Sequence, residues 1–240
     1  MRKNSVSTVF CLLGLPFIAG LSGCAHSTQK KITDPKELLA RACEPGRDIK
    51  TAKGIAWLKA QSKEASGQFP ASVLAHASGP LKIEITNPLG GREALIEVSD
   101  SKFKIHGTGS KVRTQEGYGT WGGIPLNWAS DLFIGRIPCP HLSSNQGQGV
   151  STSVDSAGDL VVETRQDGAG ATEKFIYHFR DLDGVPWPEA LHWERSGPLA
   201  VSVDFKFDDP EDQTRSPRKW EAKSVRGEVR ARWRDRNVVR

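Results

Sequence analysis

Polar and apolar residues alternate along most of the chain between residues 53 and 208. The clearest run covers residues 199–207, where Leu, Val, Val, Phe and Phe occupy every second position. Residues 81–86, 102–106 and 175–179 repeat the pattern. A period of two predicts strands with one apolar and one wet face, which is typical of an antiparallel sheet or barrel. Gly, Pro, Asn and Asp between the runs favour hairpin turns.

Two short segments break the alternation with helical spacing. Residues 34–46 begin with Asp34 as a helix cap, continue with proline at the first helical position and end in Pro-Gly. Residues 125–136 are unusually apolar and predict a second short helix between two groups of strands. Such a helix can pack on an ordinary core or cover a cavity, and the pattern alone favours the packed core. Its apolar side is formed by Leu126, Ala129 and Phe133.

Residues 1–23 have the organisation of an export signal. Two basic residues precede an apolar run over residues 9–21, which glycine and proline interrupt and which is too short to span a bilayer. The run ends in Leu-Ser-Gly-Cys, which resembles the lipobox of bacterial lipoproteins. The resemblance implies that Cys24 becomes the lipid-modified first residue; the alternative is an ordinary signal peptide with a chance cysteine. Ala25, in place of an aspartate, implies export to the periplasmic face of the outer membrane.

Charge is distributed unevenly along the 240 residues. There are 33 Lys and Arg against 28 Asp and Glu, and ten of these bases but only five of the acids lie in residues 211–240. A nucleic-acid-binding protein usually spreads basic charge over its folded body, which argues against that class. We therefore expect four parts: a signal peptide at 1–23, a lipidated tether with a short helix at 24–50, an antiparallel barrel at 51–209 and a basic extension at 210–240.

The basic extension contains a strand-like pattern of its own. From residue 225 to residue 234, Val, Gly, Val, Ala and Trp alternate with charged residues, four of which are arginine. This predicts a strand with one basic face. That face either meets anionic lipid head groups or is the solvated outer face of a strand, and the pattern leaves both interpretations open.

No arrangement of residues predicts catalysis. The six histidines are scattered, and none has the spacing of a metal-binding pair. Residues 117–122 match G-x-G-x-x-G, but no buried strand leads into them and Pro125 follows where a nucleotide-binding helix would begin. Asp181 and Asp183 belong to an Asp-Leu-Asp-Gly sequence, which is typical of a turn. We therefore expect no enzyme, no metal and no cofactor.

Two cysteines remain in addition to those of the signal region. Cys43 and Cys139 would both face the oxidising periplasm, where unpaired thiols are uncommon. A disulfide would connect the N-terminal helix to the segment after the apolar helix. Pairing requires Cα atoms within about 7 Å, so a disulfide and two buried thiols are both open interpretations.

The sequence Ile-Thr-Asn-Pro-Leu-Gly at residues 85–90 stands between two alternating strands. It resembles a loop of the outer-membrane lipoprotein receptor family LolB. The apolar segment at residues 123–138 is similar to that family as well, and so is the order of lipobox, short helix, strands, loop, strands, apolar helix and strands. The resemblance implies a mainly β fold, an open, strongly curved antiparallel barrel or half-barrel with short lid helices.

The resemblance also implies a function and partners. Members of this family receive lipoproteins from a soluble periplasmic carrier of the LolA type, hold their acyl chains in an apolar cavity and insert them into the outer membrane. The implied partners are thus that carrier, acylated lipoprotein cargo and outer-membrane phospholipid, for a monomeric protein that binds no nucleic acid. The alternative is a non-catalytic envelope lipoprotein that acts as a scaffold or lipid-binding module.

Two groups of residues are the candidate site. In the family, the leucine that matches Leu89 protrudes and helps to push cargo lipid into the bilayer, so Pro88, Leu89 and Gly90 are expected to form a membrane-insertion loop. The apolar faces of the strands and helix are expected to line the cavity, and the alternative is that the same residues form a packed core. The expected lining is Leu81, Ile83, Ile85, Phe103, Ile105, Leu126, Phe133, Phe175, Tyr177, Phe179, Val201, Val203 and Phe205.

Overall fold

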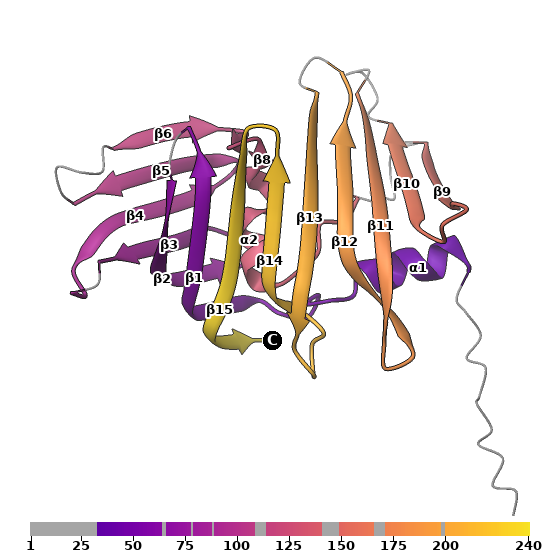
Figure 1. The fold of residues 1–240 in the computed structure, drawn as a ribbon, viewed down its shortest axis with the longest axis horizontal. Coiled ribbons are helices and arrows are strands. Elements are labelled where there is room, and N and C mark those ends of the chain that lie inside the picture. The colour runs from indigo at the N-terminus through magenta and orange to yellow at the C-terminus, as the bar shows by residue number, and fades with distance from the viewer. Residues whose placement is uncertain are drawn as a thin grey trace, which may run out of the picture. The chain divides into compact units, whose positions relative to one another are not determined.

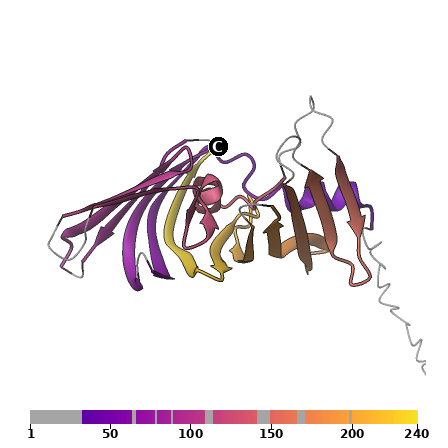
Figure 2. The same ribbon diagram turned by 90° about the horizontal axis from the view of Figure 1, so that it is seen from above.

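The computed structural model describes residues 33–63, 66–77, 79–87, 89–108, 114–140, 149–165, 171–197 and 200–240. These residues form a curved antiparallel sheet of 13 strands, a separate two-stranded hairpin and two short α-helices (Figures 1 and 2). The sheet does not close into a barrel, because its two outermost strands, β6 and β9, do not pair with each other. The predicted fold class, an open curved sheet with short lid helices, is confirmed. No helix in this part of the chain has the length and apolarity needed to cross a bilayer.

The chain builds this sheet from two meanders, with α1 before the first and the helices η1 and α2 between the two. The helical elements are α1 (Pro35–Ala42), the 3₁₀ helix η1 (Leu126–Trp128) and α2 (Ala129–Ile134). The first group of strands is β1 (Thr51–Ser62), β2 (Ser66–His76), β3 (Leu81–Thr86), β4 (Arg92–Ser99), β5 (Lys102–Gly107), β6 (Gln115–Tyr118), β7 (Thr120–Trp121) and β8 (Ile124–Pro125). The second group is β9 (Val150–Val154), β10 (Leu160–Arg165), β11 (Thr172–Leu182), β12 (Val185–Arg195), β13 (Val201–Pro210), β14 (Pro217–Ser224) and β15 (Gly227–Val239).

One strand pair joins the two meanders. The strand order is β6-β5-β4-β3-β2-β1-β15-β14-β13-β12-β11-β10-β9, so every neighbouring pair is consecutive in the chain except β1 and β15. These two strands pair along almost their whole length, from Thr51 opposite Val239 to Ser62 opposite Gly227. The first and last strands of the chain therefore lie side by side in the middle of the sheet (Figure 1).

The expectation that residues 210–240 form an extension is wrong. They form β14 and β15, two central strands, and they bury Trp220 and Trp233 at 4% and 2% exposure. Arg230, Arg232 and Arg234 mislead because they lie on the exposed outer face of β15, where water solvates them. Arg230 on that face pairs with Glu221 at 3.1 Å and with Glu228 at 2.6 Å, so neighbouring acids neutralise part of its basic charge.

A glycine allows β1 and β15 to approach each other. The register between them shifts after Ile55, and Arg234 is the extra residue of the resulting β-bulge. Gly54, at φ +151°, lies against this bulge, and a Cβ there would stand 2.2 Å from the carbonyl oxygen of Asp235. Any side chain at this position would therefore push the two central strands apart.

A disulfide connects the helical segments. Cys43, at the end of α1, is bonded to Cys139, which follows α2, with a Cα–Cα distance of 5.9 Å. The hydroxyl of Tyr177 donates to the carbonyl oxygen of the neighbouring Pro138 at 2.8 Å. The segment after α2 is thus held both to α1 and to the concave face of β11.

Replacing Gly54 tests the central strand pair. We expect Gly54→Ala to lower the free energy of unfolding by about 2 kcal/mol or more, because the new methyl group meets backbone and not a movable side chain. Gly149→Ala is the control, since a Cβ there meets no atom within 4 Å. Urea unfolding of both variants measures the difference. Equal stabilities would show that the strand pair tolerates a side chain at its bulge.

Thiol counting tests the disulfide. The fragment of residues 31–240, which has Cys43 and Cys139 as its cysteines, should give no titratable thiol when it is unfolded without a reductant, and two after reduction. Reduction should also lower the free energy of unfolding by about 2–5 kcal/mol, because the bond closes a loop of nearly a hundred residues. Two reactive thiols in the unreduced protein would contradict the pairing.

Candidate functional site

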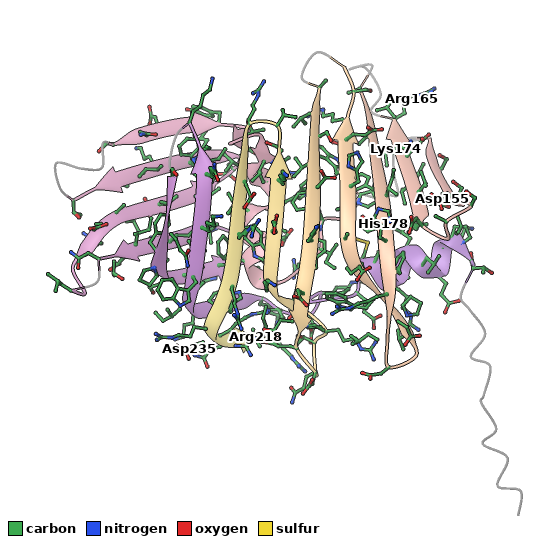
Figure 3. All side chains as sticks on the ribbon, in the orientation of Figure 1. Asp155, Arg165, Lys174, His178, Arg218 and Asp235 are labelled. Atoms are coloured by element: carbon green, nitrogen blue, oxygen red, sulfur yellow. A yellow bond between two sulfur atoms is a disulfide. The ribbon has the colours of Figure 1, made fainter. Side chains whose placement is uncertain are left out.

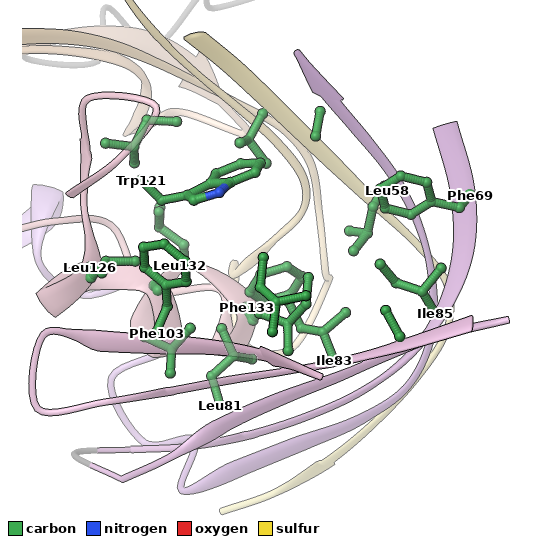
Figure 4. Close-up of a pocket in the computed structure, with 18 of the residues that line it drawn as sticks. Leu58, Phe69, Leu81, Ile83, Ile85, Phe103, Trp121, Leu126, Leu132 and Phe133 are labelled. Carbon is green, nitrogen blue, oxygen red and sulfur yellow. The ribbon is translucent and has the colours of Figure 1, made fainter. Parts of the chain in front are cut away.

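An apolar cavity of about 560 Å³ lies between the concave face of β1–β5 and the segment from β7 to α2. Figure 4 shows side chains from both sides projecting into the same space, among them Leu81 and Ile83 from β3 and Leu132 and Phe133 from α2. Ligand pockets typically have volumes of about 300–1,000 Å³, so this cavity has the size of a binding site.

The strand register explains why these positions face the cavity. On β3 the inward residues alternate with Lys82 and Glu84, which point to the outer face. Small side chains face the same space: Ala94 stands opposite Ile85 on the next strand, and Ala60 lies near the end of β1. The curved sheet and the small side chains together leave a hollow that larger residues would fill.

The cavity reaches solvent at one edge of the sheet. Four polar lining residues, Lys59, Ser66, Glu93 and Gln115, are exposed. They lie near the end of β1 and at the beginnings of β2, β4 and β6, which the antiparallel register places at the same edge. We use the name mouth edge for this row of strand ends and turns. It is where β1, β3, β5 and β14 end and where the strands after them begin.

The short helix that covers the cavity is fixed by hydrogen bonds at both ends. At its beginning, the Ser130 hydroxyl donates to the carbonyl oxygen of His76 on β2 at 2.7 Å. At its end, Gly135 adopts a left-handed conformation at φ +87°. Arg136 then donates to the carbonyl oxygens of Ile49 at 2.8 Å and Gly46 at 3.2 Å, both in the connection between α1 and β1.

A buried arginine completes the end of α2. Arg236 on β15 donates to the carbonyl oxygen of Ile134, the last residue of the helix, and to the Ser216 hydroxyl at 2.9 Å. Its side chain is fully buried, and burial lowers the pKa of the guanidinium, while Glu211 at 3.8 Å opposes this shift. A cation at a helix C-terminus is also favoured by the helix dipole. The lid is therefore bonded directly to the central strand.

Seven of the predicted lining residues do line this cavity. Leu58, Phe69 and Trp121 contribute further apolar wall, and Trp220 and Val229 belong to the segment that the sequence analysis assigned to an extension. The alternation of Val229 with charged residues was the feature of the sequence that could have indicated its inward position. The predicted residues found in the lining are Leu81, Ile83, Ile85, Phe103, Ile105, Leu126 and Phe133.

The other six lie outside the cavity, so their assignment to its lining is corrected. They belong to β11 and β13, where Trp128 of η1 packs on the concave face, with ring centroids 4.7 Å from Trp193 and 5.9 Å from Phe205. Burial raises the pKa of Tyr177. These strands alternate just as the cavity strands do, but large aromatic rings fill the space that they enclose. The six residues are Phe175, Tyr177, Phe179, Val201, Val203 and Phe205.

The loop between β3 and β4 projects Leu89 into solvent at 96% exposure. The Asn87 side-chain oxygen accepts from the amides of Leu89 at 3.0 Å and Gly91 at 2.8 Å, and Gly90 has φ +84°. These bonds fix a tight tip whose leucine contacts little of the protein. Pro88 and the predicted lipid-attachment residue Cys24 lie outside the described residues.

The described residues that line the cavity include two ionisable side chains, those of Lys59 and Glu93. Within the described ranges, no group of three or more His, Cys, Asp or Glu side chains could hold a metal ion. The predicted turn at Asp181 is present, and its side chain accepts from the amide of Gly184 at 2.7 Å. What the cavity offers a ligand is therefore apolar surface with a polar rim.

Comparison with known proteins gives structural likenesses only. No protein-family model and no curated protein matches the sequence. A LolA superfamily protein from Nitrosomonas europaea aligns with a TM-score of 0.49 and 9% identity, over 87% of this chain and 94% of that one. A domain from Vibrio parahaemolyticus, described as outer membrane lipoprotein-sorting, aligns with a TM-score of 0.44 and 6% identity over 85% and 90%. Lipoprotein LppX from Mycobacterium tuberculosis gives 0.32 and 11% over 83% and 94%.

Proposed function

We propose that this protein is a lipid-anchored receptor of the outer membrane, which takes the acyl chains of lipoproteins into its cavity and releases them into the bilayer. The observation that carries the proposal is the 560 Å³ apolar hollow, which opens at a polar rim beneath a fixed lid. A ligand that suits it has a long apolar part and a polar end. Acylated lipoproteins have this chemistry.

The energetics of transfer require such a hollow. Burial of each CH₂ group contributes about 0.8 kcal/mol, so a 16-carbon chain in water would cost on the order of 12 kcal/mol. A carrier must shelter this surface without binding it irreversibly. A cavity that is open at one edge meets both requirements, whereas a core filled by its own side chains meets neither.

The anchor and the partners belong to the same proposal. Acylation of Cys24 would hold the protein at the periplasmic face of the outer membrane, next to the bilayer that accepts the cargo. The cargo would come from a soluble periplasmic carrier of the LolA type, and the chain would act as a monomer. The alternative, a scaffold lipoprotein, would leave the cavity without a ligand, so an acyl-binding measurement separates the two.

A charge in the cavity wall tests acyl binding. Ile96 lies on β4, lines the cavity and is half-buried, so Ile96→Glu should preserve folding but place a carboxylate where the acyl chain would lie. We expect affinity for BODIPY-labelled palmitate and for a dipalmitoylated lipopeptide to fall by about tenfold or more. Fluorescence titration measures this affinity.

The neighbouring residue provides a matched control. Leu95 is also half-buried, but it lies on the opposite face of β4 and outside the cavity. Leu95→Glu introduces the same charge into the same strand and should bind both probes like the parent protein. If the parent binds neither probe, or both variants bind as the parent does, the cavity is not an acyl site.

A second variant tests delivery. One leucine inserted among acyl chains gains only about 1.5–3 kcal/mol, too little to anchor a protein but enough to orient it. We expect Leu89→Glu to retain acyl binding and acceptance of cargo from a LolA-type carrier but to block insertion of lipoprotein into liposomes. Leu89→Phe, which keeps the tip apolar, should deliver at the parental rate. Parental delivery by Leu89→Glu would remove the role of the loop.

A further inference from the structure

We propose that the mouth edge docks on an anionic phospholipid surface through a second tip in addition to Leu89. This tip is the turn between β14 and β15, where Val225 is apolar and Arg226 is basic. Val225 is 98% exposed, as fully as Leu89. This inference deepens the proposed function and rests on it, because docking at this edge would turn the cavity towards the bilayer that receives the cargo.

Strand register places both tips at the same edge of the sheet. Ser62 at the end of β1 stands opposite Gly227 at the beginning of β15, so the β14–β15 turn lies beside the β1–β2 turn. The antiparallel pairing of β2 with β3 brings the β3–β4 loop to the same edge. In Figure 1 the β14–β15 turn lies close to the arrowhead of β1. The two most exposed aliphatic side chains among the described residues thus flank the cavity mouth.

The Val225 tip is held rigidly against the cavity cover. The Ser224 hydroxyl oxygen accepts from the amides of Arg226 at 3.0 Å and Gly227 at 3.2 Å, and the hydroxyl donates to the carbonyl oxygen of Gly122 at 2.6 Å. Gly122 follows Trp121, which lines the cavity. Contact of the tip with a membrane would therefore be transmitted directly to the wall of the mouth.

Charge at the mouth edge suits an anionic partner. Lys63, Arg92 and Arg226 are exposed at the turns of this edge, and none of them forms an ion pair within the part of the chain that the structure describes. Of the acids nearby, Glu228 is already engaged by Arg230 at 2.6 Å, whereas Glu93 and Glu116 are exposed near the beginnings of β4 and β6. Each well-placed base near an anionic bilayer strengthens binding to it.

The opposite edge carries more acidic turns. Four of its hairpin turns carry the exposed aspartates Asp100, Asp155, Asp183 and Asp212, and Figure 3 labels Asp155 beside β9 and β10. The exposed bases Lys50, Lys102 and Arg240 lie at this edge as well, so it carries charge of both signs. The apolar tips at the mouth edge therefore orient the molecule, and they distinguish a bilayer from a purely acidic protein surface.

Vesicle binding tests the docking surface. Residues 31–240 form one compact unit with the complete sheet, both helices and the disulfide, so this fragment reports binding without the lipid anchor. We expect the fragment to sediment with vesicles that contain both phosphatidylglycerol and phosphatidylcholine, and the bound fraction to fall at high salt. It should not sediment with vesicles of phosphatidylcholine alone. Val225→Glu should weaken binding about tenfold, and Lys63→Gln with Arg226→Gln by a similar factor.

Val239→Glu is the matched control. Val239 is also exposed, at 59%, but it lies at the far edge, at the end of β15, so this variant should bind like the parent. Equal binding by parent and Val225→Glu, or equal binding to both vesicle types, would overturn the docking surface. Val225→Glu should still bind BODIPY-labelled palmitate in solution. If the parent binds vesicles but does not bind the labelled palmitate, the proposed function is contradicted and the docking surface is not.

Discussion

The pairing of β1 with β15 is the interaction on which the rest of the structure depends. It is the one place in the sheet where neighbouring strands are not consecutive in the chain, and it turns two meanders into a single curved surface. The same strand β15 supplies Arg236 to the end of the lid helix, and its Trp233 packs edge-on against Phe133 at 6.4 Å. Gly54 is needed because this pairing brings the backbone of Asp235 so close that a methyl group at position 54 would overlap with it.

Local pattern predicted several of the strands, their antiparallel arrangement and both helices, because each depends on spacing or turn residues that are close in sequence. The open, curved form of the sheet was expected only from the family resemblance. The position of β15 could not be predicted in this way. Its alternation was visible, but a partner near the other end of the chain leaves no local signal, and its arginines looked like a basic tail. Arg230, Arg232 and Arg234 lie on the exposed outer face of this central strand, where Arg230 is between two glutamates.

The two halves of the sheet show why the residues that line the cavity cannot be derived from alternation alone. Ile83 and Phe205 occupy equivalent inward positions on strands of the same kind, yet one faces a hollow and the other faces Trp128. What differs is the volume of the opposing side chains: Ala60 and Ala94 leave space on one side, and aromatic rings fill it on the other. This difference arises from tertiary contacts across the sheet, so the pattern within a strand does not reveal it.

The central position of the last strand also governs how the molecule assembles. Contacts between the two ends of a chain form slowly, because a long loop must close before they contribute stability. The disulfide can form earlier, since both of its cysteines precede β9. Until β15 docks, the first meander has neither its neighbour nor the arginine that fixes the lid. The cavity is therefore completed only in the final step of folding, and loss of the last strand would remove the cavity rather than trim the protein.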